Sequence, residues 1–286
     1  MRVERGCRTG GFVPVELLAI ITIVLLFATI ALPMIARVKA RMLTTKCLNN
    51  HRQLARAFQL YATDNVGKCP NNFIIPDTER AIVENSFDTW ANNIMTWTAG
   101  GTVMDRSVTN TVWAGKSLLH PYTDGDVTVY SCPADRYLSP VQRARGYNRR
   151  VRSVSMNALI GNVTKTPTST PWRSWGFGGQ YRQWLKLRDI PNPAKTWLTI
   201  DEHPDSLNDG FFINDPATPY WGDYPGTLHG NGTSFSFADG HVEFHPWRSR
   251  SVRARVSFQY VFQPRTDVAT RQDLKWYHER AGLVRY

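Results

Sequence analysis

Hydrophobic positions form one long uninterrupted run near the start of the chain and several short runs further on. The long run covers residues 17–36 and contains no charged side chain. A helix rises about 1.5 Å per residue, so these residues would form a helix of about 30 Å, the thickness of a bilayer's hydrocarbon core. A secretory signal peptide fits poorly, because the run is long and a helical pattern follows it in place of a cleavage site. The pattern predicts a membrane-spanning helix.

The residues after this run continue a helical pattern in amphipathic form. Apolar side chains between residues 38 and 61 recur at steps of three, four and seven, which places them on one helix face. Gly67 and Pro70 then supply a stop signal. We therefore expect one helix from Phe12 to about Asn65, its first half in lipid and its second half against a globular head.

Short β-like runs separated by turn signals follow in the second half of the chain. In the clearest one, residues 235–244, alternating apolar residues flank Asp239 and Gly240, a pair typical of a hairpin turn. The other runs are residues 126–133, 152–159, 195–202 and 210–214. Together they predict an antiparallel sheet packed on the long helix, an α+β fold.

Two residues of the apolar segment are costly in a bilayer. Glu16 lies at its start, and a carboxylate inside a membrane costs up to about 2.5–3.5 kcal/mol at mid-membrane unless it has a partner. Pro33 removes a backbone hydrogen bond, which costs about 3 kcal/mol in a helix. A neighbouring chain can compensate both, by a cation beside Glu16 and by a bundle that fits a bend at Pro33. The pattern predicts a segment that packs against copies of its own kind.

The residues that carry these features, GGFVPVELLAIITIVLLFATIALP, resemble the N-terminal signal of type IV pilins and type II secretion pseudopilins. The resemblance implies that a prepilin peptidase cuts after Gly11 and that Phe12 becomes a methylated N-terminus. Glu16 would then be the fifth residue of the mature chain, which in this family meets the N-terminal amine of a neighbouring subunit. Pro33 lies where pilins commonly carry a helix-loosening proline.

The same resemblance implies an organisation for the whole chain. Residues 1–11 would be a cleaved leader, 12–36 the transmembrane helix, 37–66 an amphipathic stalk helix and 67–286 an extracytoplasmic, β-rich head. Pro14 departs from the family's usual leucine, but the first turn of a helix tolerates proline. The basic residues after the apolar run conflict with the positive-inside rule, so the orientation rests on the resemblance. We expect a single-pass protein of the inner (cytoplasmic) membrane with its head in the periplasm or outside the cell.

Later segments, including YSCPAD, RSVSMN and DIPNPAKTWLTIDE, resemble a large pseudopilin-like group of planctomycete and verrucomicrobial proteins. The group's hallmark is a histidine, nine residues and then Asp-Gly, here His229 and Asp239-Gly240. The group often has cysteines at the positions of Cys47 and Cys132, which makes these two the disulfide candidate. Cys69 with Cys132 is the rival pairing.

Composition leaves room for one ordinary globular domain besides the membrane segment, in 286 residues of which 42% are hydrophobic. The net charge of +11 is concentrated at residues 37–63, 143–152 and 248–255. These clusters could face phosphates of nucleic acid or lipid, but none carries a nucleic-acid-binding signature. A solvated basic surface is the favoured interpretation, and nucleic acid is not an expected partner. The cysteines form no CxxC pair, so neither a zinc knuckle nor a thioredoxin-like motif is expected.

Catalytic motifs are missing from the head, which has no GxSxG, HExxH or phosphate-cradling loop, so the chain is not predicted to be an enzyme. The stretch DEHPDSLNDG has acidic oxygens at short spacings, as calcium loops do, although it lacks the EF-hand spacing. Major pseudopilins of type II secretion bind calcium in the head, so the resemblance makes calcium the one cofactor considered. Otherwise no cofactor is expected. The candidate ligands are Asp201, Glu202, Asp205 and Asp209. His229 is interpreted as a residue that braces the predicted hairpin.

These observations predict a pilin-like subunit that a prepilin peptidase processes. Its N-terminal helix would assemble with copies of itself or with other pseudopilins into a type II secretion pseudopilus or a related fibre. A membrane-tethered binding module that never polymerises, with a head that holds an envelope ligand or DNA, is the alternative. A metal-dependent head enzyme is a third interpretation.

Overall fold

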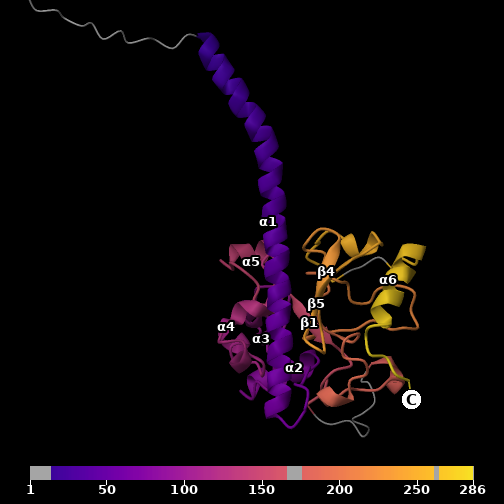
Figure 1. Ribbon diagram of the computed structural model, residues 1–286. Coiled ribbons are helices and arrows are strands. Elements are labelled where there is room, and N and C mark those ends of the chain that lie inside the picture. The colour runs from indigo at the N-terminus through magenta and orange to yellow at the C-terminus, as the bar shows by residue number, and fades with distance from the viewer. Residues whose placement is uncertain (1–13, 166–175, 261–263, 286) are drawn as a thin grey trace, which may run out of the picture. The chain divides into compact units, whose positions relative to one another are not determined.

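The computed structural model describes residues 14–165, 176–260 and 264–285. Its longest element is helix α1, Pro14–Asp64, drawn in indigo in Figure 1. The predicted single helix through the apolar and amphipathic stretches is confirmed, and its end lies one residue from the predicted one. The predicted start at Phe12 lies outside the described residues. The chain divides into two compact units, residues 1–42 and 43–286.

The part of α1 in the first unit is long and apolar enough to cross a membrane, and none of its most apolar stretch is buried. Glu16 is in the first turn and Pro33 lies inside the helix. The hydroxyl groups of Thr22 and Thr29 donate to the carbonyl groups of Leu18 and Leu26 within the helix. These bonds satisfy polar groups that hydrocarbon could not.

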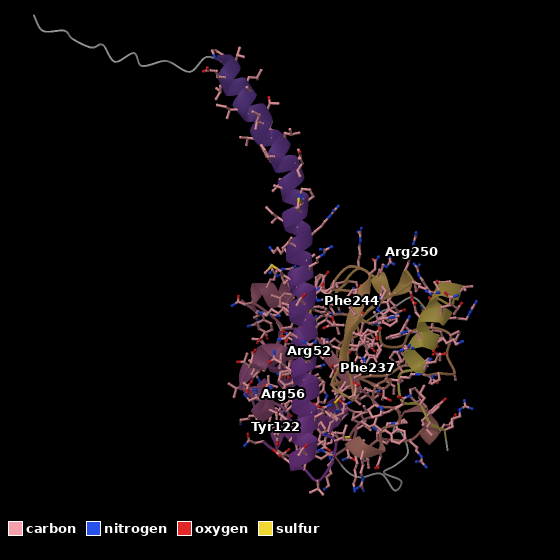
Figure 2. The ribbon with its side chains drawn as sticks, in the orientation of Figure 1. Arg52, Arg56, Tyr122, Phe237, Phe244 and Arg250 are labelled. Carbon is pink, nitrogen blue, oxygen red and sulfur yellow. The ribbon has the colours of Figure 1, made fainter. Side chains whose placement is uncertain are left out.

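The part of α1 in the second unit buries one face. The buried side chains recur at steps of three and four residues, singly or with a near neighbour, and are Cys47, Asn50, His51, Leu54, Ala55, Ala57, Phe58 and Ala62. Arg52 and Arg56, labelled in Figure 2, are exposed on the same helix. The predicted amphipathic pattern is therefore present in the second unit, where α1 packs on the sheet.

Five strands form one sheet in the order β3-β1-β2-β4-β5. The strands are β1 Val154–Asn157, β2 Trp197–Asp201, β3 Phe211–Phe212, β4 Gly232–Phe237 and β5 Val242–Pro246. All pairings are antiparallel except that of β1 with β3, which is parallel. The predicted α+β fold, a long helix on a sheet, is confirmed, and the parallel pair is its one departure from the expected antiparallel sheet.

Strands β4 and β5 form the predicted hairpin. Its turn contains Asp239, whose carboxylate accepts the His241 amide at 3.1 Å, and Gly240, which has φ +97°. Glycine adopts this left-handed conformation without steric cost, which explains the Asp-Gly pair.

The predicted strand over residues 126–133 is wrong, because Val127–Tyr130 is a 3-10 helix, η2. The Asp126 side chain accepts the Thr128 amide at 2.8 Å and starts a helical turn, a local bond that competes with strand formation. Val129 and Tyr130 are nevertheless buried, so the apolar pattern correctly indicated burial but not the type of secondary structure.

The remaining helices are short. They are α2 Ile75–Val83, α3 Val103–Ser107, α4 Thr111–Ala114, η1 His120–Tyr122, α5 Pro140–Ala144, η3 Phe177–Gly179, η4 Leu187–Asp189, η5 Ser251–Arg253 and α6 Val268–His278. Helix α6 lies on the other side of the strands from α1 (Figure 1).

Two apolar clusters fill the two sides of the sheet. Leu54 and Phe58 of α1 pack with Val154 of β1 in one, and Phe235 of β4 packs with Tyr277 of α6 in the other. The sheet is therefore covered on both faces, and polar side chains of its α1 side are sealed from water.

Candidate functional site

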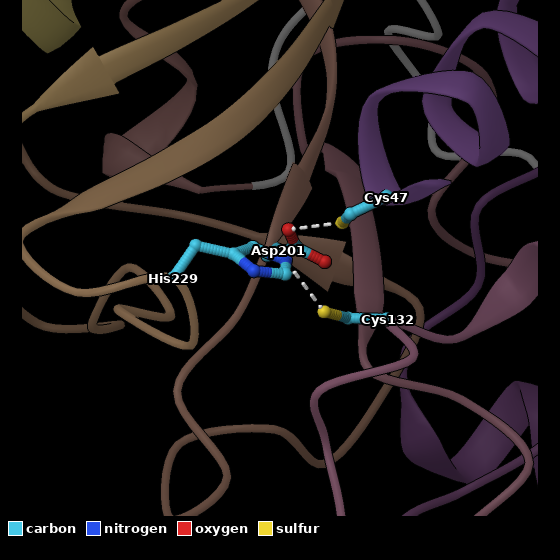
Figure 3. Close-up of side chains that lie close together, drawn as sticks. All are labelled: Cys47, Cys132, Asp201 and His229. Carbon is cyan, nitrogen blue, oxygen red and sulfur yellow. Dashed lines mark hydrogen bonds between the residues drawn. The ribbon is translucent and has the colours of Figure 1, made fainter. Parts of the chain in front are cut away.

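Four side chains from distant parts of the sequence meet between α1 and the sheet (Figure 3). Cys47 is on α1, Cys132 follows η2, Asp201 ends β2 and His229 precedes β4. Cys47 Sγ lies 2.9 Å from Asp201 Oδ2, and Cys132 Sγ lies 3.0 Å from His229 Nε2. One ligand atom from each residue lies within 4.8 Å of every other.

The cluster is nearly closed to solvent. Cys47, Cys132 and Asp201 are each 0% exposed, and His229 is half-buried. A carboxylate and two sulfur atoms are therefore held together in a region from which water is largely excluded, where electrostatic interactions are strong.

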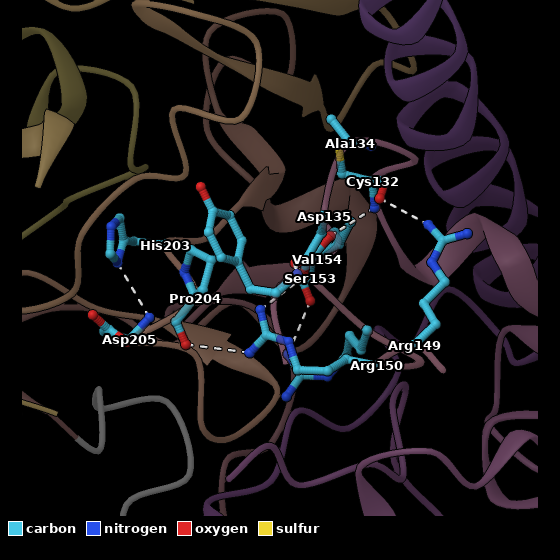
Figure 4. A network of polar contacts seen from close by, with 12 residues as sticks. Cys132, Ala134, Asp135, Arg149, Arg150, Ser153, Val154, His203, Pro204 and Asp205 are labelled. Carbon is cyan, nitrogen blue, oxygen red and sulfur yellow. Dashed lines mark hydrogen bonds and ion pairs between the residues drawn. The ribbon is translucent and has the colours of Figure 1, made fainter. Parts of the chain in front are cut away.

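The local chain positions Cys132 by hydrogen bonds on three sides (Figure 4). Its amide donates to Ser153 Oγ at 2.6 Å, and its carbonyl oxygen accepts from the Arg149 guanidinium at 2.8 Å. The Ala134 amide donates to Cys132 Sγ at 3.4 Å. The sulfur is thus fixed in direction as well as in place.

A buried ion pair supports the same loop. Arg150 Nη2 lies 2.8 Å from Asp135 Oδ2, with both side chains buried, and Arg150 Nη1 donates to the Pro204 carbonyl at 3.2 Å. The pair links the residues after Cys132 to the segment after β2 (Figure 4). Because each charge has a partner, the burial of Arg150 is tolerated.

The two thiols have opposite pKa shifts. Burial raises the pKa of Cys47 well above its usual value, and hydrogen bonding with Cys132 and the charge of Asp201 add to the rise. Burial also opposes a thiolate at Cys132, but hydrogen bonds with Cys47 and His229 outweigh it and lower the pKa of Cys132. The pKa of His229 is raised, because its hydrogen bond and charge interaction with Cys132 outweigh burial. The pKa shifts of Cys132 and His229 are opposite in sign because each group stabilises the charged form of the other.

His51 also belongs to this polar cluster, and the sequence analysis did not identify it. Its Nε2 lies 3.4 Å from Asp201 Oδ2, and its Nδ1 lies 2.7 Å from Thr199 Oγ1, which in turn lies 2.5 Å from Ser236 Oγ. The signal that could have found it is its spacing, since it follows Cys47 by four residues and so shares its helix face.

Two buried atoms of the cluster have no hydrogen-bond partner among the described residues. They are Asp201 Oδ1 and His51 Nε2. A buried polar atom without a partner is costly, and in native proteins it often marks a place where an ion or water binds.

The predicted acidic ligands do not converge. Asp201 joins the cysteines, while Glu202 accepts the hydroxyl groups of Ser155 at 2.5 Å and Ser206 at 2.7 Å. Asp205 accepts the amides of residues 257 and 258 at 2.7 and 3.0 Å.

Asp209 accepts the Phe211 amide at 3.3 Å and interacts electrostatically with Glu202 and with the buried Arg152. Among the residues 14–165, 176–260 and 264–285, the group of possible metal ligands contains Asp201 and none of the other three carboxylates. Calcium binding stays a prediction without a shared ligand set.

The motif residues lie at opposite ends of one strand. His229 precedes β4, and Asp239 and Gly240 follow it. Six residues of strand span about 20 Å, so the histidine lies at the other end of β4 from the hairpin turn. It contacts Cys132 instead.

The disulfide candidates Cys47 and Cys132 are free thiols that lie together, and Cys69 is also free. Cys69 is buried in the apolar cluster beneath α1, where burial raises its pKa to about 12. The processing residues Gly11 and Phe12 lie outside the described residues.

A separate pocket of about 350 Å³ opens near the loop that carries Cys132. Hydroxyl groups and Arg149 contribute to its lining. The hydroxyl-bearing residues are Thr109, Thr111, Thr128, Ser131 and Tyr147. Its size and polar groups match those of small-molecule sites.

Comparisons with protein-family models, with curated proteins and with solved structures gave no match to this chain.

Proposed function

We propose that the chain is a pilin-like structural subunit that assembles through its N-terminal helix into a type II secretion pseudopilus or a related fibre. The observation that carries the proposal is the exposed apolar half of α1. Leu18 is 67% exposed and Phe27 69%, in a helix that continues into a folded, β-rich unit. Apolar surface of this extent requires lipid or other apolar helices around it.

Glu16 and Pro33 favour assembly over a solitary anchor. Glu16 is in the first turn, exposed on the helix, where the amine of a neighbouring subunit would reach it. Pro33 interrupts the hydrogen-bond ladder near the C-terminal end of the apolar half. Both features destabilise a single span, whereas neighbouring helices in a bundle compensate them.

Processing and location follow from the same proposal. A prepilin peptidase would cut after Gly11 and leave Phe12 as the amine that pairs with Glu16 of the next subunit. The mature protein would be a single-pass protein of the inner membrane, with the unit of residues 43–286 in the periplasm or outside the cell. The head would display its surface outward and act without catalysis.

The decisive experiment replaces Glu16 and measures assembly in native membranes. In Glu16→Ala, subunit crosslinks typical of a fibre should be lost while membrane insertion is retained, because only the intersubunit charge pair is removed. Glu279→Ala, an exposed carboxylate at the end of α6, is the matched control and should assemble as the parent does. Unchanged crosslinks in Glu16→Ala, or a wild-type protein that never crosslinks to itself, would reject the proposal.

The pocket beside the Cys132 loop favours one other candidate, a tethered binding module. Its hydroxyl groups and Arg149 suit a polar or anionic envelope ligand. That interpretation replaces the first if the wild-type protein remains solitary in the membrane and Arg149→Met abolishes binding of an envelope component to the purified full chain.

A further inference from the structure

We propose that Cys47, Cys132, Asp201 and His229 bind one zinc ion. The site is independent of fibre assembly, because all four ligands belong to the compact unit of residues 43–286. It also differs from a disulfide between Cys47 and Cys132, since it requires both thiols to be reduced.

The spacing of the four ligand atoms suits a tetrahedral ion. Zinc bonds of about 2.3 Å to sulfur and about 2.0–2.2 Å to nitrogen and oxygen place neighbouring ligand atoms roughly 3.3–3.8 Å apart. Here the Cys47–Asp201 and Cys132–His229 pairs are 2.9 and 3.0 Å apart, and no pair among the four exceeds 4.8 Å. The four atoms therefore bracket the tetrahedral separation, and small side-chain adjustments would admit the ion.

The chemistry of the ligand set selects zinc over the calcium expected from the sequence. Calcium prefers six to eight oxygen ligands, whereas thiolate and imidazole ligands favour zinc among the common divalent ions. Two thiolates and one carboxylate carry a charge of −3, which a divalent ion reduces to −1. The ion would therefore offset most of the electrostatic cost of burying these groups.

The surroundings supply the outer hydrogen bonds that metal ligands need. His51 lies beside Asp201 and is oriented by Thr199. The Ala134 amide donates to Cys132 Sγ. Such outer partners hold ligands in place and tune them.

Asp201 Oδ1 provides an independent indication. It is buried and accepts no hydrogen bond from the described part of the chain. The ion would bind one carboxylate oxygen, and a small rotation of His51 would bring its Nε2 to the other. Both atoms without partners would then be satisfied.

The site has the character of a structural centre. Four protein ligands leave no open position for substrate, and three of them are fully buried. Cys47 and Asp201 are 154 residues apart in sequence, and the ion would join α1 to the end of β2. Binding would therefore hold the helix to the sheet.

The test uses the full-length chain, purified in detergent, reduced and freed of metal. Titration with Co²⁺ should give thiolate-to-cobalt charge-transfer bands and the intense visible bands of tetrahedral cobalt, saturating at one equivalent. Zn²⁺ should abolish these bands and raise the melting temperature. A reduced wild-type protein that gives no bands saturating at one equivalent overturns the proposal, whatever the variants do.

Variants locate the site. Cys47→Ser should bind Co²⁺ more weakly and give weaker charge-transfer bands at saturation, because only the Cys132 thiolate remains. His229→Ala should also bind Co²⁺ at least tenfold more weakly. His51→Leu, which removes only the outer partner, should weaken binding about 10–100-fold. Cys69→Ser is the matched control, a buried free thiol outside the cluster, and should titrate as the wild type does.

The redox state of Cys47 and Cys132 in the native protein distinguishes the zinc site from a disulfide. Peptide mapping of unreduced protein from native membranes should show Cys47 and Cys132 unlinked, with zinc present in the protein. A bridge between Cys47 and Cys132 in zinc-free native protein would replace the metal site by a disulfide. That result would leave the fibre proposal intact.

Discussion

At Gly161 the backbone itself requires glycine. The residue has φ +80°, and a Cβ added there would lie 2.0 Å from the Pro70 carbonyl oxygen. Its amide donates to the Trp184 carbonyl at 2.9 Å, which holds the close approach in place. The contact joins the loop after α1 to the segment after β1. These two segments can approach so closely only because Gly161 has no Cβ.

Gly161→Ala should therefore lower the free energy of unfolding by about 3 kcal/mol or more, because a left-handed conformation and a backbone clash combine. Gly125→Ala isolates the first effect, since Gly125 has φ +76° but no neighbouring atom within 4 Å, and should cost about 1 kcal/mol. Thermal unfolding of the two full-length variants in detergent measures the difference. Equal losses would show that the loop moves aside.

At the scale of elements, strand β4 separates the two parts of the histidine–Asp-Gly motif and so gives them different structural roles. The strand is six residues long, with His229 before it and the Asp239-Gly240 turn after it. The nine-residue spacing is therefore the length of a strand plus its approach and turn, and it places the histidine beside Cys132. One end of the motif builds a polar cluster and the other builds a turn.

Helix α6 depends on the residue that precedes it, Asp267. The Asp267 side chain accepts the Thr270 amide at 2.8 Å and caps the helix whose Leu274 and Tyr277 pack on the sheet. Asp267→Ala should lower the free energy of unfolding by about 1 kcal/mol. Lys275→Ala, on the exposed face of α6, should change it by less than about 0.5 kcal/mol. Chemical denaturation of both variants compares them, and a loss in the control alone would contradict the assignment of the cap.

At the scale of the whole molecule, burial of acidic side chains links stability to pH. Burial raises the pKa of Asp209 to about 7 and that of Asp223 to about 8. Burial also raises the pKa of Glu202 well above its usual value. The folded state thus retains protons that the unfolded chain releases near pH 4.

Because the folded pKa of Asp209 is raised, its contribution to stability is full below the unfolded pKa and is lost as pH rises through about 7. Between about pH 6.5 and 8.5 this loss amounts to about 1 kcal/mol. Asp209→Asn cannot ionise, so melting temperatures across that range should fall less in the variant than in the wild type. The charge of Asp209 also contributes to the raised pKa values of Asp223 and Glu202, so the variant removes that contribution as well. Parallel pH profiles of variant and wild type would contradict the raised pKa of Asp209.

Local patterns along the chain were enough to predict its helix–sheet plan. The uninterrupted apolar run and the amphipathic stretch after it predict α1, and the Asp-Gly pair predicts the β4–β5 hairpin. These features depend on near neighbours in sequence, whose periodicity and backbone preferences can be read directly. The same reasoning misassigned Val127–Tyr130, because an alternating apolar pattern does not show whether a local hydrogen bond, here from the Thr128 amide to Asp126, starts a turn of 3-10 helix.

Local sequence patterns could not predict the polar cluster. Cys47, Cys132, Asp201 and His229 are separated by dozens of residues, and each has an ordinary local explanation in sequence. They meet because α1 packs across the sheet where β2 ends and the chain approaches β4. Such a meeting depends on strand order and helix packing, which arise from long-range contacts and leave no fixed spacing in the chain.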